Sequence, residues 1–105
     1  MDKKLFYIEG KKRLTLLREQ NFYICFDPIK LEYFHINVTG AYILYLVSKK
    51  CKLDTIVNIF IDEYKIEKNE CREIVLSFLD NFPLKNIIYH NLIDNDRYLE
   101  LPPFK

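Results

Sequence analysis

The chain has 105 residues, of which half are hydrophobic and 30% are charged, and 16 basic residues nearly balance 15 acidic ones to give a formal net charge of +1. This composition is typical of a single soluble globular domain, and so small a net charge disfavours a protein that depends on attraction to phosphate backbones. Only two glycines occur, Gly10 and Gly40, which excludes glycine-rich phosphate-binding loops.

The sequence contains no targeting or membrane-spanning pattern. No apolar run approaches the roughly 20 residues of a bilayer helix, and the first residues lack the apolar stretch of a signal peptide, so we expect a cytoplasmic protein. Cys25, Cys51 and Cys71 are odd in number and have no Cys-x-x-Cys spacing. We therefore expect free thiols, with neither a disulfide framework nor a metal site, and no cofactor.

Three short runs rich in aromatic and β-branched residues predict a three-stranded antiparallel sheet in the first part of the chain. The runs are residues 14–17, 22–26 and 31–36. Residues 20–21 and 27–30 separate them and carry turn signals, the second with Asp followed by Pro. A further strand over residues 4–8 is an alternative that the pattern leaves open.

Apolar residues change to helical spacing after the sheet. Asn37 is a good N-cap, and the pattern that follows predicts a first helix to about Lys49. A complete amphipathic stripe over residues 53–64 predicts a second helix. Lys52 is a poor capping residue, so we expect this helix to start later, at Asp54, or to fray in its first turn.

A third apolar stripe predicts a helix over residues 70–82, which Pro83 ends because the residue before a proline avoids helical geometry. Beyond it, short apolar runs around a turn-like segment indicate either a hairpin or a loose tail. The predicted organisation is thus an α+β domain over residues 1–83, with three strands followed by three helices, and a C-terminal hairpin or tail over residues 84–105.

The junction between the sheet and the first helix resembles a known family. Residues 33–43 read Tyr-Phe-His-Ile-Asn-Val-Thr-Gly-Ala-Tyr-Ile. Together with the order of elements, this segment resembles the PqqD-like family of peptide recognition elements, which carries a Leu-Asn-x-Thr-Gly/Ala-x-x-Ile junction. The positions matching that pattern are Asn37, Gly40, Ala41 and Ile43, and the resemblance spans roughly residues 14–82.

The resemblance implies a non-enzymatic protein that binds the leader region of a ribosomally synthesised precursor peptide and presents it to a modifying enzyme, often a radical S-adenosylmethionine enzyme. The leader would add a strand to an exposed sheet edge, with main-chain hydrogen bonds giving affinity and side chains giving selectivity. By resemblance, the peptide-binding residues are Leu31, Glu32, Tyr33, Phe34, His35 and Ile36 on the edge strand, and Arg72, Val75, Leu76 and Leu79 on the third helix. An exposed edge also leaves homodimerisation open.

Two other functions stay open at this point. Three helices and a terminal hairpin also fit a winged-helix transcription regulator. Against that interpretation, acidic residues outnumber Lys68 and Arg72 on the third helix, where a recognition helix should be basic. A structural subunit that binds the modifying enzyme without touching its peptide is the other alternative. His35 and His90 lack a nucleophile or carboxylate constellation, so no catalytic residue is assigned.

Overall fold

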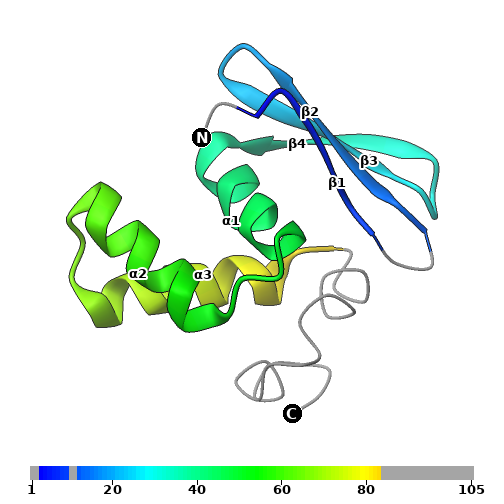
Figure 1. Ribbon diagram of the computed structural model, residues 1–105. Helices are drawn as coiled ribbons and strands as arrows, with labels where there is room; N and C mark the ends of the chain where they lie inside the picture. The colour runs from blue at the N-terminus through cyan, green and yellow to red at the C-terminus, as the bar shows by residue number, and fades with distance from the viewer. Residues whose placement is uncertain (1–2, 10–11, 84–105) are drawn as a thin grey trace.

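The computed structural model describes residues 3–9 and 12–83, in which a four-stranded antiparallel sheet is followed by three helices (Figure 1). The elements are β1 (Leu5–Ile8), β2 (Leu14–Glu19), β3 (Phe22–Asp27), β4 (Glu32–Asn37), α1 (Val38–Ser48), α2 (Leu53–Tyr64) and α3 (Lys68–Asn81). The α+β class and the three helices are confirmed. The expectation of three strands is wrong by one strand.

The additional strand is β1, which pairs antiparallel with β2 from Leu5 opposite Leu17 to Ile8 opposite Leu14. It is short, but alternate residues of β1 carry large apolar side chains to the helix side of the sheet, where Phe6 and Ile8 are buried. Burial of two such side chains gives a four-residue strand enough stabilisation to form.

The strands follow one another in the order β1-β2-β3-β4, so β1 and β4 are the two outer strands. The helices lie on one side of the sheet, with α1 next to it and α2 and α3 packed together beyond α1 (Figure 1). The core lies between these layers. Its largest fully buried side chains are Ile8, Leu14, Leu16, Tyr23, Ile43, Leu44, Leu53, Ile56 and Leu79.

The helix starts show how local chemistry sets the boundaries. The Asn37 carboxamide accepts a hydrogen bond from the Gly40 N–H at 2.7 Å, which confirms the predicted N-cap of α1. The helix α2 begins at Leu53 although Lys52 makes no side-chain cap bond, so the expected delay to Asp54 is wrong. The main chain compensates, because the Ile56 N–H already bonds to the Lys52 carbonyl at 3.0 Å.

The third helix begins earlier than the stripe predicts, because Glu67 caps it. Its carboxylate accepts a hydrogen bond from the Glu70 N–H at 2.9 Å. Backbone hydrogen bonds from Asn69 and Glu70 hold the pKa of Glu67 below its usual range. The helix then ends at Asn81, before Pro83.

The predicted C-terminal hairpin or tail, residues 84–105, lies outside the described residues, and the division of the chain at residue 83 stays a prediction. In the part of the chain that the structure describes, none of the helices combines the length and the apolar character needed to cross a bilayer.

Candidate functional site

The outer strand β4 is the predicted site. It pairs with β3 along its whole length, from Glu32 opposite Asp27 to Asn37 opposite Phe22. Among residues 3–9 and 12–83, no strand pairs with its other side. An unpaired sheet edge presents a row of hydrogen-bonding groups that a further strand can use.

The main-chain groups of β4 alternate between the paired and the outer side. Arg18 donates its N–H to the Lys4 carbonyl at 2.7 Å, so this residue of β2 turns toward β1. Successive residues of an antiparallel strand turn to opposite neighbours. The registers of β2 with β3 and of β3 with β4 extend this alternation across the sheet. By it, the N–H and C=O groups of Tyr33 and His35 point away from β3, toward the outer side of β4.

The side chains of β4 are less covered than those of its neighbour. Phe34 and Ile36 lie on the helix side, opposite Cys25 and Tyr23 of β3. The two β3 side chains are fully buried, whereas Phe34 and Ile36 are only half-buried. On the other face Tyr33 is 71% exposed. The apolar layer under the sheet is therefore incomplete at β4.

The end of α3 lies beside this incomplete layer. The ring of Phe82 contacts Phe34 of β4 with centroids 5.8 Å apart, and Phe78 lies the same distance from Phe82. Phe78 also lies directly on the first turn of α1, where a Cβ on Gly40 would come within 2.6 Å of its Cε2 atom. Gly40 thus allows the close approach of α3 to the strand-helix junction.

The structure places the four predicted residues of α3 in two different surroundings. Val75 is 1% exposed and Leu79 is fully buried, so both belong to the core. Arg72 turns toward α2, where its Nη1 lies 3.5 Å from Asp54 Oδ1, and Leu76 follows it one turn later.

The aromatic contacts between α3 and β4 involve side chains outside the predicted set. Phe78 and Phe82 make the contacts described above, and Ile74, one turn before Phe78, is 45% exposed. Sequence reasoning included all three in the apolar stripe without assigning them to the site. The helical period of 3.6 residues shows that these three residues lie along one margin of the apolar stripe. It does not show that this margin lies beside β4.

Leu31 also differs from its prediction. It lies outside β4, has a positive φ of 58° and is a turn residue whose N–H bonds to the Asp27 carbonyl at 2.9 Å. The Asp27 carboxylate stabilises the same turn by accepting hydrogen bonds from the backbone N–H groups of Ile29 and Lys30. The other five predicted edge residues, Glu32 to Ile36, lie in β4.

The sheet face away from the helices is unusually apolar. Antiparallel sheets with one open face normally present polar side chains there. Here that face carries exposed large apolar side chains on all four strands, namely Leu5, Tyr7, Leu17, Phe22 and Tyr33. A strand added at β4 would extend an apolar surface on this side as well.

The thiol of Cys25 lies beneath the sheet, opposite Phe34 of β4. Burial, and secondarily the charge of Asp27, raise the pKa of the Cys25 thiol to about 12, so it stays protonated at neutral pH. Burial likewise raises the pKa of Cys71. His35 lies on the open face with its ring 4.8 Å from that of Phe22.

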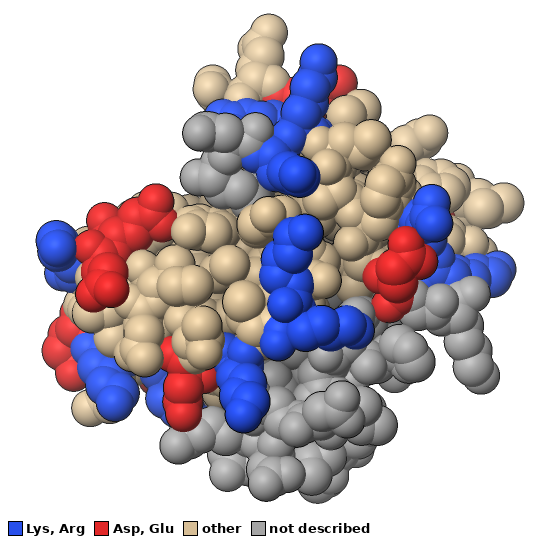
Figure 2. Space-filling model, in the orientation of Figure 1, with Lys and Arg blue, Asp and Glu red and all other residues tan. Residues whose placement is uncertain are grey.

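The visible charges are mixed in sign. In Figure 2 basic and acidic side chains are interspersed with uncharged ones, without a continuous basic face in this view. A nucleic-acid interface would need such a basic face. This arrangement agrees with the small net charge of the chain.

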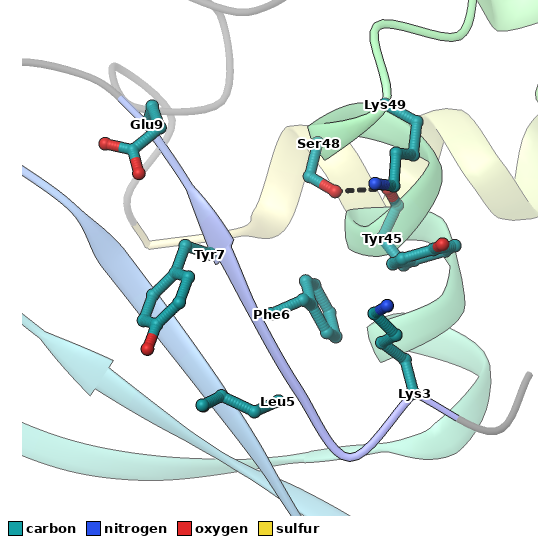
Figure 3. A pocket seen from close by; sticks show the side chains of 8 residues that line it. All are labelled: Lys3, Leu5, Phe6, Tyr7, Glu9, Tyr45, Ser48 and Lys49. Carbon is teal, nitrogen blue, oxygen red and sulfur yellow. Dashed lines mark hydrogen bonds between the residues drawn. The ribbon is translucent and has the colours of Figure 1, made fainter.

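A measurable hollow lies at the opposite edge of the sheet from β4. It has a volume of about 270 Å³ and lies between β1 and the end of α1 (Figure 3). Its lining residues are Lys3, Leu5, Phe6, Tyr7, Glu9, Tyr45, Ser48 and Lys49. The two outer strands therefore differ in their surroundings as well as in their length.

A protein-family model matches much of the chain. The family model described as "Coenzyme PQQ synthesis protein D (PqqD)" matches residues 23–88, a range that begins in β3 and includes β4 and the three helices. No curated protein and no solved structure matches the chain.

Proposed function

Because the chain belongs to the PqqD family, whose model matches more than half of its residues, we propose that it binds the leader region of a precursor peptide along β4 and presents it to a modifying enzyme. Members of this family are accessory proteins in the synthesis of coenzyme PQQ or other ribosomally made, modified peptides, and they work with a precursor peptide and biosynthetic enzymes. In this proposal the chain contributes binding and positioning, and the partner enzyme performs the chemistry.

The observation that carries the proposal is the incomplete packing at β4. The strand combines outward main-chain groups at Tyr33 and His35 with half-buried apolar side chains at Phe34 and Ile36. A guest strand would satisfy both at once, since it pairs with the outward groups and covers the apolar side chains. Each main-chain hydrogen bond contributes about 1 kcal/mol, and burial adds about 25 cal/mol for each Å² of apolar surface.

The two faces of β4 indicate what the guest should carry. Alternate guest side chains would point to the helix side, toward Phe34 and the aromatic end of α3. The others would point to the open face, beside Tyr33 and His35. Because both surroundings are apolar or aromatic, we expect leader segments with apolar residues on both sides of the bound strand.

A proline substitution tests the main-chain part of the proposal. The N–H of Tyr33 points away from β3, so Tyr33→Pro should keep the sheet while removing a donor for the guest. We expect at least about a tenfold loss of affinity for a fluorescein-labelled leader peptide in anisotropy titrations. Labelled leaders of candidate precursors encoded near the gene are the probes.

The matched control is Tyr33→Val, which removes the same ring but keeps the N–H and suits a strand. It separates loss of the side chain from loss of the donor. Circular dichroism and thermal melting of both variants show that the fold persists. If a leader binds wild type, Tyr33→Val and Tyr33→Pro equally well, the guest does not lie along β4.

The partner enzyme forms the second part of the proposal. We propose a radical S-adenosylmethionine enzyme, following the resemblance at the Asn37 to Ile43 junction and the family match. Size-exclusion chromatography of the chain, its leader and a candidate enzyme should yield a ternary complex. An enzyme that modifies the precursor equally fast with and without the chain would contradict the presenting role.

A further inference from the structure

The turn between β3 and β4 and the first residues of β4 carry the most exposed large apolar side chains of the described residues. Ile29 is 61% exposed, and Leu31 and Tyr33 are each 71% exposed. The other exposed large apolar side chains in the described part of the chain reach at most 45%. Exposed apolar side chains that gather in one place commonly mark a surface for protein contacts. The peptide site at β4 does not account for Ile29 or Leu31, because both precede the strand.

The backbone of this turn is held by hydrogen bonds to one anchor. The Asp27 carboxylate accepts the N–H groups of Ile29 at 2.8 Å and of Lys30 at 3.0 Å, and the Asp27 carbonyl accepts the Leu31 N–H at 2.9 Å. Asp27 is buried, so the anchor is part of the folded sheet. Pro28 fixes a further backbone angle. The two apolar side chains are therefore presented by an ordered main chain, which lowers the entropy lost when a partner binds.

Leu31 has a backbone conformation that a leucine side chain does not favour. Its φ is 58°, and the other described non-glycine residues with positive φ, namely Gln20, Lys50 and Lys65, are all polar. Glycine and asparagine adopt this region at lower cost. An exposed leucine here serves neither the backbone nor the core, so its side chain is better explained by a contact outside the chain.

The direction of a bound leader, which rests on the proposed function, places this turn where the peptide leaves β4. Every strand pair of the sheet is antiparallel, and an antiparallel guest continues the pattern with slightly more stable pairing than a parallel one. Since β4 runs from the turn toward α1, the guest runs from α1 toward the turn. A leader is the N-terminal part of its precursor, so the segment to be modified emerges beside the turn.

We propose that the β3–β4 turn is the surface on which the modifying enzyme docks, with Ile29, Leu31 and the neighbouring Tyr33 entering an apolar pocket of the enzyme. The enzyme then receives the segment to be modified at the point where it leaves the chain. In Figure 1 the turn lies at the opposite end of the sheet from α2. An enzyme docked there approaches one end of β4 and leaves the length of the strand free for the leader.

The first test determines the direction of the bound leader. The probe is the shortest leader that retains full affinity, with a nitroxide label at its C-terminal or its N-terminal residue. The C-terminal label should broaden the amide NMR signals of Ile29 and Lys30 more than those of Val38 and Thr39, and the N-terminal label should do the reverse. The opposite pattern overturns the docking surface but leaves leader binding at β4 intact, because the peptide then leaves at α1.

The second test removes the apolar side chains of the turn. Leu31→Asn suits the positive φ, and Ile29→Ser keeps the N–H that bonds to Asp27, so both variants should fold. The double variant Ile29→Ser/Leu31→Asn should bind the enzyme of the ternary-complex experiment about tenfold more weakly, measured without peptide by interferometry on immobilised enzyme. Its affinity for the labelled leader should be unchanged, because both residues lie outside β4.

The matched control is Leu5→Thr, which removes an exposed leucine from the other outer strand and suits a strand. It should change neither enzyme affinity nor leader affinity. Circular dichroism and thermal melting show that each variant is folded. An equal loss of enzyme affinity in Leu5→Thr overturns the proposal, because the enzyme then contacts the sheet far from the turn.

The remaining outcomes separate this docking surface from the proposed function. Unchanged enzyme affinity in the double variant, with normal leader binding, overturns the docking surface alone. A double variant that loses leader affinity instead places the turn in the peptide site and also overturns it. A wild-type chain whose self-association, seen by sedimentation velocity, is lost in the double variant while enzyme affinity persists shows that a second copy occupies the turn. A chain that binds no leader overturns both proposals.

Discussion

The two outer strands of the sheet differ in how completely their apolar side chains are buried. On β1, Phe6 and Ile8 are buried beneath α1 although the strand has four residues. On β4, a six-residue strand, the corresponding Phe34 and Ile36 are half-buried. Both strands present an outer edge, but of the two only β4 combines that edge with apolar side chains that are incompletely buried.

The difference teaches that an unpaired edge is not by itself evidence of a peptide site. Main-chain groups at an edge are satisfied by water at little cost, so they add only a small net gain on pairing. Partly exposed apolar side chains add the larger gain, because covering them removes apolar surface from water. By this reasoning β4 suits a guest peptide better than β1 does, because the apolar side chains of β1 are already buried.

The largest expected effect compares the same substitution on the two strands. Ile8→Ala should lower the free energy of unfolding by about 3 kcal/mol, since Ile8 is fully buried and its loss leaves a cavity. Ile36→Ala removes the same atoms from a half-buried position and should cost about 1 kcal/mol. Urea denaturation of the two variants measures the difference. Equal costs would show that β4 is packed as completely as β1.

The next effect concerns the two flanks of α3. Phe78→Ala should weaken leader binding about tenfold, because Phe78 belongs to the aromatic group beside β4. Leu76→Ala is the matched control, also half-buried but on the flank shared with Arg72. Anisotropy titration with the same labelled leader compares them. A greater loss with Leu76→Ala would place the guest on the other side of α3.

The smallest effect reports whether β4 separates from the sheet. Cys25 lies opposite Phe34, and an opening of β4 would expose its thiol. With a folded pKa of about 12, Cys25 should react with iodoacetamide far more slowly than the half-buried Cys51. Mass spectrometry of the digested protein at successive times measures how fast each cysteine is labelled. Rapid labelling of Cys25 in the native protein would show that β4 frays.

The same thiol gives a pH dependence of known sign. An unfolded cysteine ionises near pH 8.5, whereas folded Cys25 keeps its proton until about pH 12. The unfolded state therefore binds fewer protons in this window, and stability falls as pH rises through it, by at most about 1.4 kcal/mol per pH unit. The effect is fully absent below the unfolded pKa. Cys25→Ser should flatten this part of the stability profile.

Local patterns determined much of the fold. The amphipathic stripe from residue 53 to residue 64 predicted α2, although Lys52 wrongly suggested a later start, and Asn37 predicted the start of α1 because its side chain needs only a neighbouring N–H. The run at residues 31–36 predicted β4 to within one residue at each end, because the strand spans Glu32–Asn37. These features depend on contacts between residues close in sequence, which periodicity and capping chemistry describe directly.

The tertiary structure decided what depends on distant contacts. The local pattern left a strand over residues 4–8 as an open alternative, and burial of Phe6 and Ile8 under the helical layer decided that β1 forms. Which flank of α3 meets β4 was settled by Phe78 on Gly40 and Phe82 on Phe34, so Arg72 and Leu76 turned out to lie on the other side. A helical period shows which residues share a face, but the rotation of that face toward a strand is set by packing between elements far apart in the chain.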